Sequence, residues 1–210
     1  MTAAGQPSHG PGHGPGYSPG LGFDDYTLDS QAVFRAVLDA TARPGRISTV
    51  RARPETPAPL DVATTAVALC LFDHDTRIWL GDGIAGVAVY EYLRFHCGCP
   101  IVKSGLAADF AVVLAAAGVP GLSQFDTGSD AFPDRSATLV IQVPDLEGGA
   151  PVRLTGPGIE TEEILKIAGV PDYFWNERLT QQEMFPRGID LVFACGDRLV
   201  ALPRSTEIEV

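Results

Sequence analysis

The sequence predicts an α/β protein with a mixed β-sheet flanked by helices. Helix-like and strand-like apolar segments alternate through the chain, which is typical of this class. Residues 77 to 102 read as strand, helix and strand, with a crossover long enough for a parallel pair. Residues 189 to 202 read as an antiparallel hairpin. Parallel and antiparallel pairing together predict a mixed sheet.

The first half of the chain is expected to contribute three helices and two short strands. Val33, Phe34, Val37 and Leu38 have helical spacing, with Asp29 or Ser30 as N-cap and Pro44 and Gly45 as stop. The helix after the proline-rich connector is apolar on all sides and is expected to be buried. The predicted elements are a helix at Ser30–Ala42, a helix at Val62–Phe72, a strand at Arg77–Leu80, a helix at Ile84–His96 and a strand at Ile101–Val102.

The second half is expected to contain further strands separated by loops rich in Gly, Pro and Asp. The turn of the C-terminal hairpin is Cys195-Gly196-Asp197. The predicted strands are Phe110–Leu114, Ala137–Val143, Val152–Thr155, Ile189–Ala194, Arg198–Leu202 and Thr206–Val210, and the predicted helices are Glu162–Ala168 and Asp172–Gln182.

Composition predicts one globular domain at residues 23–210 behind a disordered Gly/Pro-rich tail at residues 1–22. The tail has neither the charged nor the apolar part of a secretory signal, so we expect a cytoplasmic protein. The apolar stretches are too short to span a bilayer, which argues against a membrane role. The four cysteines are expected to be reduced thiols.

The net charge of −11 argues against nucleic acid as a partner, because such a field repels polyanions. The basic residues are 13 arginines and only two lysines, Lys103 and Lys166. Arginine favours bidentate contacts with phosphate or carboxylate, so a small anionic ligand or an acidic partner is one interpretation. Surface ion pairs are the other.

Gly81-Asp-Gly83-Ile-Ala-Gly86 matches the G-x-G-x-x-G pattern of dinucleotide-binding loops. The surroundings do not fit that fold, because the second strand is followed by Lys103 rather than by an acidic residue that would bind the ribose. A glycine-rich turn is the competing interpretation. A nicotinamide-dinucleotide-binding oxidoreductase using Gly81 to Gly86 is kept as an alternative function.

Two further groups of residues could carry chemistry. His96, Cys97 and Cys99 are soft donors that could hold a metal with a fourth ligand such as His74, but one cluster is half a site, so no metal is predicted. Asp73-His74-Asp75 could make His74 a proton carrier. Polar residues also crowd into turns for backbone reasons, and that interpretation is preferred.

Several dispersed segments resemble the PhnH family, whose members belong to the carbon-phosphorus lyase system of phosphonate degradation. The resemblance extends from about Phe23 to the C-terminus. Its segments are Phe34-Arg35 through Pro44-Gly45, Ala63-Thr64-Thr65, Asp73 and Asp75-Thr76 to Trp79-Leu80, Leu93 to His96, Leu154-Thr155-Gly156 with Gly158-Ile159, Phe185-Pro186 with Gly188 to Leu191, and Pro203-Arg204 with Thr206, Glu209 and Val210.

The resemblance implies a fold similar to the large domain of pyridoxal-phosphate-dependent transferases, without that cofactor. It also implies a homodimer when isolated and a complex with the carbon-phosphorus lyase subunits G, I and J. The implied reaction, for which the family is needed together with subunits G, I and L, replaces the adenine of ATP with an alkylphosphonate and gives a ribose 1-phosphonate 5′-triphosphate. A nucleotide or phosphonate ligand follows from it. Gly81, Gly83, Gly86, Cys97 and Cys99 do not belong to the family pattern.

Four residues are expected to act if this chain contributes to the site of the complex. Arg94, Arg153 and Arg204 would bind phosphonate or triphosphate oxygens, and His96 would donate a proton to the departing adenine as general acid. A purely structural scaffold is the competing hypothesis, in which the same residues hold the fold and its interfaces.

Overall fold

The computed structural model describes residues 20–84 and 86–210. The predicted disordered tail lies outside the described residues except for residues 20–22. These three are held against the domain, where the Leu21 N–H donates to Glu55 and the Tyr92 hydroxyl donates to the Leu21 carbonyl. No helix in the described part of the chain is long and apolar enough to cross a membrane.

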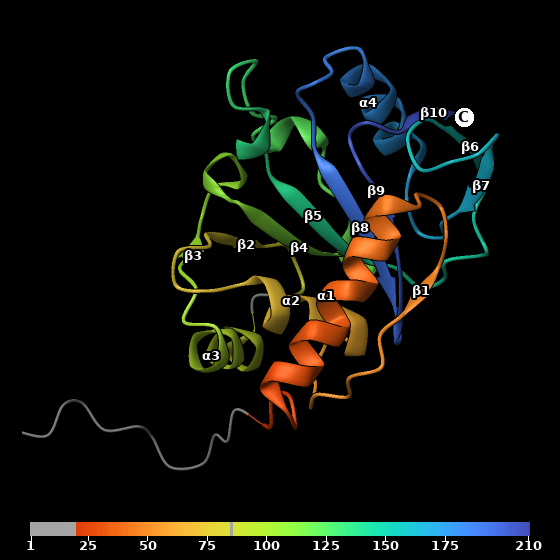
Figure 1. The fold of residues 1–210 in the computed structure, drawn as a ribbon. Helices are drawn as coiled ribbons and strands as arrows, with labels where there is room; N and C mark the ends of the chain where they lie inside the picture. Colours follow the sequence, from red (N-terminus) through yellow and green to blue (C-terminus); the bar gives the residue numbers. More distant parts are fainter. Residues whose placement is uncertain (1–19, 85) are drawn as a thin grey trace, which may run out of the picture.

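The chain folds into a seven-stranded mixed sheet and a separate three-stranded antiparallel sheet (Figure 1). The order of the large sheet is β1-β9-β8-β5-β4-β2-β3, with parallel pairing from β8 to β3. Its strands are β1 (Ser48–Thr49), β2 (Ile78–Leu80), β3 (Ile101–Val102), β4 (Phe110–Leu114), β5 (Thr138–Gln142), β8 (Asp190–Cys195) and β9 (Arg198–Leu202). The predicted mixed sheet, parallel β2–β3 pair and C-terminal hairpin are confirmed.

The small sheet has the order β10-β6-β7, formed by β6 (Pro151–Thr155), β7 (Glu163–Lys166) and β10 (Glu207–Glu209). The helix predicted at Glu162–Ala168 is wrong, because β7 occupies this segment. Leu165 and Ile167 are buried in the core, whereas Ile164 and Lys166 are exposed, which is the two-residue period of a strand. Pairing with β6 therefore prevails over the helical composition of this segment.

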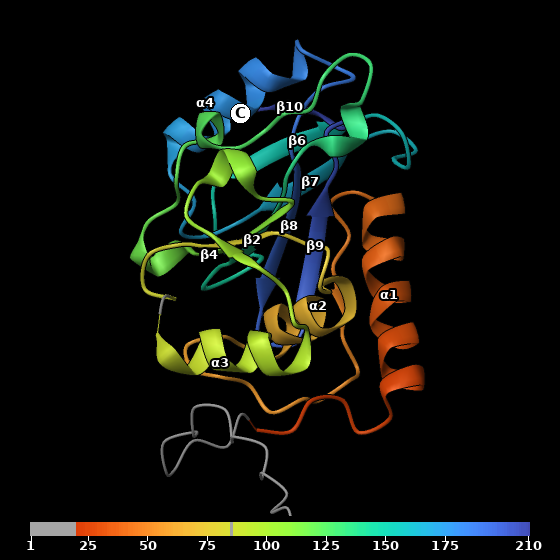
Figure 2. The ribbon, with the colours of Figure 1, turned by 90° about the vertical axis from the view of Figure 1, so that its left-hand side faces the viewer.

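Helices cover one face of the large sheet, and the small sheet and α4 cover the other (Figures 1 and 2). Central strands such as β5 are therefore buried on both sides and read as continuous apolar segments. The helices are α1 (Tyr26–Ala42), α2 (Val62–Leu71), α3 (Val87–His96) and α4 (Asp172–Gln182), with one-turn 3-10 helices η1 (Gly105–Ala107), η2 (Ala115–Ala117), η3 (Leu122–Gln124) and η4 (Pro133–Arg135). The flanking helices of the predicted class are confirmed.

Two helix starts differ from the prediction. Helix α1 begins at Tyr26, about one turn earlier than expected, because the Asp25 carboxylate caps it by accepting from the N–H groups of Thr27 and Leu28. Helix α3 begins at Val87 rather than Ile84, because Gly83 has a φ of +78° and Gly86 is an extended N-cap. Strand β1 is not predicted from the sequence, since two residues carry no periodicity.

Arg178 joins α4 to the segment between β9 and β10. Its side chain is 1% exposed, and Nη2 donates to the carbonyl oxygens of Pro203, Arg204 and Thr206. Burial lowers the pKa of Arg178 to about 10, which still leaves the guanidinium charged at neutral pH. The buried guanidinium satisfies three carbonyl oxygens of the segment after β9. These hydrogen bonds fix the path of the chain from β9 in the large sheet to β10 in the small sheet.

Candidate functional site

The candidate site is a cavity of about 480 Å³ between α3 and the last two strands of the large sheet, β2 and β3. It contains the residues at the carboxyl ends of these parallel strands, where ligands commonly bind in open α/β sheets. We call it the α3 pocket. Its lining residues are Trp79, Leu80, Gly86, Val87, Tyr90, Glu91, Ile101, Val102 and Lys103.

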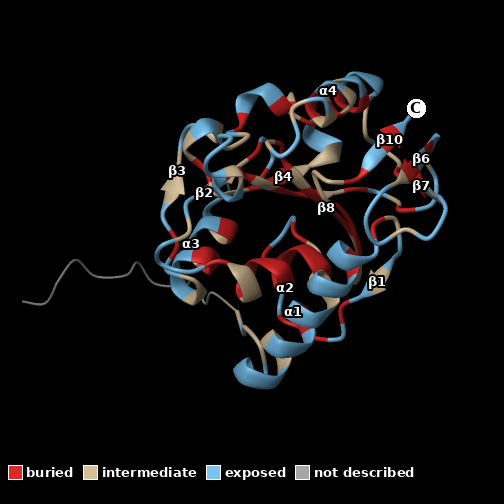
Figure 3. Ribbon diagram, turned by 45° about the horizontal axis from the view of Figure 1, so that its top comes forward, coloured by how far each residue is buried: buried red, intermediate tan, exposed pale blue. Residues whose placement is uncertain are grey.

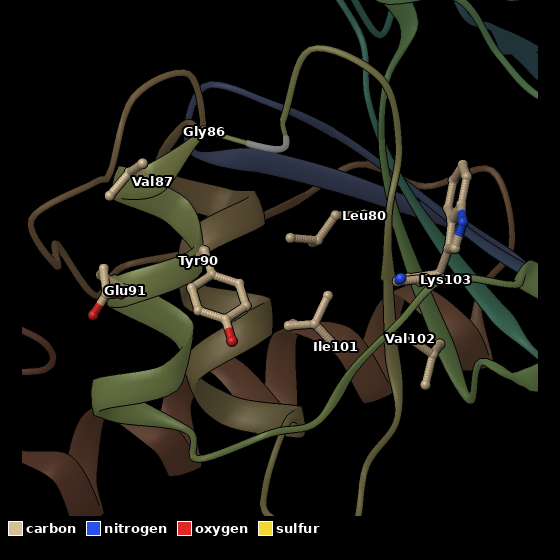
Figure 4. Close-up of a pocket in the computed structure, with 9 residues that line it drawn as sticks. Leu80, Gly86, Val87, Tyr90, Glu91, Ile101, Val102 and Lys103 are labelled. Carbon is tan, nitrogen blue, oxygen red and sulfur yellow. The ribbon is translucent and has the colours of Figure 1, made fainter.

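The α3 pocket is mainly apolar, and two charged residues, Glu91 and Lys103, are among those that line it. Figure 4 shows the Tyr90 ring beside Ile101 and the Lys103 amine directed into the same space, whereas Val87 and Glu91 lie on the outer side of α3. The Trp79 indole packs edge-on against Phe125, with ring centroids 5.4 Å apart, in the core on the other face of the sheet, so Tyr90 supplies the aromatic ring on the α3 side. An apolar cavity with an aromatic ring and few polar groups has the chemistry of a small-molecule site.

Besides the carboxylate of Glu91, two features that favour an anionic group lie at the pocket. Gly86 begins α3 without a side-chain cap, so the positive end of the helix dipole faces the rim. Lys103 follows β3 directly and adds a full positive charge. A flat apolar ring beside Tyr90 and an anionic group near Lys103 would both be accommodated.

The glycine-rich loop between β2 and α3 has a structural explanation. The Gly81 N–H donates to the Val112 carbonyl of β4, and the Ile84 N–H donates back to Gly81. A Cβ on Gly83 would lie 2.9 Å from the Cβ of Ala117, so the loops after β2 and β4 meet closely here. Residue 85 lies outside the described residues. The residue after β3 is Lys103, not the acidic residue that a dinucleotide fold places there.

His96 lies at the C-terminal end of α3, away from the pocket. Its Nε2 is 3.2 Å from the Gly20 carbonyl oxygen, and its ring packs against Tyr92 and Phe95 with centroid distances of 4.4 and 4.9 Å. A Cβ on Gly22 would be 3.0 Å from Nδ1. His96 therefore holds residues 20–22 against α3. Its neighbour Arg94 is exposed and makes no hydrogen bond or ion pair with any described residue.

Arg153 and Arg204 are each paired with carboxylates inside the fold. Arg153 of β6 bonds Glu162 at 3.1 Å and Glu209 at 2.6 Å, and these hydrogen bonds, Glu209 first, raise its pKa. Arg204 makes a two-pronged contact with Asp190, at 2.6 Å through Nη2 and 3.3 Å through Nε, and also donates to the Pro133 carbonyl.

The structure does not bring the four expected residues together. Arg94 and His96 lie at one end of α3, whereas Arg153 lies in the small sheet on the opposite face of the large sheet (Figure 1). Arg204 lies between β9 and β10. Internal partners occupy Arg153, Arg204 and His96. The hypothesis of one joint site built by these four residues therefore receives no geometric support in the isolated chain.

Cys97 and Cys99 lie in the turn between α3 and β3 as free thiols. A hydrogen bond between the two, followed by burial, raises the pKa of Cys97, and the same bond lowers the pKa of Cys99. His74 is exposed and pairs instead with Asp75 at 3.3 Å. Within residues 20–84 and 86–210 no three His, Cys, Asp or Glu side chains form a metal-binding group.

The residues that line the α3 pocket are not predicted as a site from the sequence. Trp79 and Tyr90 read as ordinary apolar residues of a strand and a helix, and only the fold makes both of them line one cavity. One signal was available, because the carboxyl end of the second strand in a strand-helix-strand unit is a common ligand position. Lys103 occupies that position.

Comparison with known proteins gives three matches. The model of the family described as bacterial phosphonate metabolism protein (PhnH) matches residues 21–209. The alpha-D-ribose 1-methylphosphonate 5-triphosphate synthase subunit PhnH of Rhizobium meliloti (strain 1021) is 40% identical over 187 residues, which are 89% of this chain and 94% of that protein. HtxG of Stutzerimonas stutzeri, whose name places it with C-P lyase subunits, is 31% identical over 182 residues, 86% of each chain.

Proposed function

Because the chain belongs to the PhnH family of bacterial phosphonate metabolism proteins, we propose that it is a subunit of an assembly that synthesises alpha-D-ribose 1-methylphosphonate 5-triphosphate. The observation that carries this proposal is the 40% identity, over 94% of its length, to a subunit of that synthase. In this step an alkylphosphonate displaces the adenine of ATP. The assembly belongs to the carbon-phosphorus lyase route of phosphonate degradation.

The chain acts without turnover of its own. Three of the four residues expected to act have internal partners, and a general acid whose ring lies beneath residues 20–22 is not free to protonate a leaving group. This favours a supporting role over an independent active centre. Arg94 is exposed and free among the described residues, so it is the one of the four that is available to a ligand or to a partner.

A nucleotide or phosphonate ligand fits best in the α3 pocket. The Tyr90 ring, beside the apolar side chains of Leu80 and Ile101, offers a surface for a base, and Lys103 with the N-terminus of α3 offers positive charge for phosphate or phosphonate oxygens. The dinucleotide alternative uses the same place but lacks its acidic ribose ligand after β3. This favours a nucleotide or phosphonate of the synthase reaction over a nicotinamide cofactor.

The proposed partners are subunits G, I and J of the carbon-phosphorus lyase core complex, in the cytoplasm. For the isolated chain we propose a homodimer. The large sheet, with its parallel strands and helix-covered face, is compatible with a fold similar to the large domain of pyridoxal-phosphate-dependent transferases without their cofactor.

Co-purification of the tagged full chain with co-expressed subunits G, I and J tests the proposal. A stoichiometric complex is expected, and a chain that remains alone with all three partners present would contradict the function. Alanine variants of Arg94 and His96 in that complex then separate two roles. Lost synthase activity with normal assembly indicates a site, whereas lost assembly indicates a scaffold.

A further inference from the structure

The arginines of this chain are almost all paired internally. Of the 13, ten make an ion pair, a hydrogen bond or a ring contact within the described residues. Within that same part of the chain, Arg35, Arg51 and Arg94 make none. Eight of the ten pair with a carboxylate, so the three without any partner among the described residues stand apart.

Arg35 and Arg51 lie together. Both line a groove of about 270 Å³ between α1 and β1, which is the terminal strand of the large sheet. The other lining residues are Leu28, Gln31, Ala32 and Thr49, so the groove contains no carboxylate among the described residues. Two guanidinium groups that share a groove without a counter-ion form a local positive patch on an acidic protein.

Large apolar side chains are also exposed on the outer side of α1, and one of them, Leu28, lines the groove. Leu28 is 63% exposed, Phe34 51% and Leu38 56%, although they belong to a helix whose inner side packs on the sheet. Figure 2 shows α1 on the outside of the molecule, and in Figure 3 most of its surface is exposed. Exposed apolar side chains in contact with polar groups are typical of protein interfaces.

We propose that this surface, which we call the α1–β1 surface (Leu28, Gln31, Phe34, Arg35, Leu38, Thr49 and Arg51), binds a neighbouring subunit of the synthase assembly. The bound segment carries carboxylates that pair with Arg35 and Arg51, next to apolar side chains that cover Leu28, Phe34 and Leu38. The inference rests on the proposed function, because it requires the chain to be a subunit of an assembly.

The two unpaired arginines and the exposed apolar side chains together indicate that the α1–β1 surface binds a protein rather than a small anion. A phosphate would neutralise the two arginines but would leave the apolar residues of α1 in water. An acidic protein segment covers both. Arginine is also favoured at interfaces, because its planar fork binds carboxylates in a bidentate way and its stem packs on apolar groups.

Single charge reversals in the full chain test the inference by co-purification with subunits G, I and J. Arg35→Glu and Arg51→Glu each change the net charge by two, and Lys166→Glu makes the same change on the exposed surface of β7. We expect the wild type and Lys166→Glu to form the complex, and each arginine variant to bind its partners at least about tenfold more weakly. Raising the salt concentration should weaken the wild-type complex more than the variant complexes.

The outcomes are distinguishable. Thermal unfolding of each isolated variant should match the wild type, because both arginines are exposed, and Arg35→Gln and Arg51→Gln replace any variant that unfolds. If the arginine variants assemble as well as Lys166→Glu, the inference is wrong although the proposed function stands. If the wild type stays alone, both fail. If the reversals split an isolated dimer and leave the complex intact, the surface joins two copies of this chain, which also overturns the inference.

Discussion

The role proposed for Lys103 depends on its position in the fold. In the sequence it is one of two isolated lysines without an activating neighbour. In the fold it follows β3 and faces a cavity that also contains Trp79 and Tyr90. A charge at the rim of an apolar cavity orients an anionic ligand, because the surrounding apolar groups reduce competition from water.

We therefore expect Lys103→Glu to reduce the affinity of the full chain for ATP at least about tenfold, the loss of one charge-assisted contact. Isothermal titration calorimetry measures the affinity. Lys166→Glu changes the net charge equally but lies on β7, and it should bind as the wild type does. Equal affinity of the two variants would show that Lys103 does not contact the ligand. A wild type that binds neither ATP nor methylphosphonate would contradict the proposal that the pocket binds a nucleotide or phosphonate.

At the scale of elements, the connection between β6 and β7 fits tightly under the end of α1. Gly158 has a φ of +85°, and a Cβ on it would collide with the carbonyl oxygen of Ala42, the last residue of α1. Gly158 also belongs to a segment by which the chain resembles its family. Close backbone approach explains that glycine without any ligand.

Gly158→Ala should lower the free energy of unfolding by ~3 kcal/mol, because both the backbone angle and the contact with α1 become unfavourable. Gly98→Ala is the matched control. Gly98 also has a positive φ, +66°, but nothing lies within 4 Å of its added Cβ, so only about 1 kcal/mol is expected. Urea unfolding of both variants measures the difference. Equal losses would show that the approach to α1 adds nothing.

At the scale of the whole molecule, charge is distributed unevenly. The chain carries a net charge of −11, and most of its arginines serve as internal partners for carboxylates, as in the pairs Arg77–Asp109 and Arg204–Asp190. The positive charge that is left over in the described part of the chain concentrates on the α1–β1 surface, at Arg94 and at the pocket. These are places for anionic ligands or partners, and none of them holds an assembled acid–base pair of described residues.

The isolated chain should therefore release no adenine from ATP in the presence of methylphosphonate. Release is expected only when the chain is combined with subunits G, I and L, and it should stop when the chain is left out of that mixture. Chromatographic detection of free adenine measures both. Adenine release by the chain alone would show an independent active centre and contradict the supporting role.

The sequence by itself determined the order of most elements and the family. Helices α2 and α4, strand β4 and the hairpin of β8 and β9 follow from local periodicity and turn residues, and the structure confirms them. The expected membership in the PhnH family is confirmed by the family match and the two relatives. Dispersed family residues are readable in sequence, because each is recognised without knowing its neighbours in space.

The tertiary structure alone decided which segments pair and which charges meet. Glu163–Lys166 is a strand because it pairs with one edge of β6, and β10 pairs with the other edge of β6 instead of extending the large sheet. Arg153 forms a hydrogen bond with Glu209, which is 56 residues away in the sequence. Trp79 lines one cavity together with Tyr90 and Lys103. Strand pairing, ion pairs and cavities depend on contacts between residues distant in sequence, and local periodicity carries no information about them.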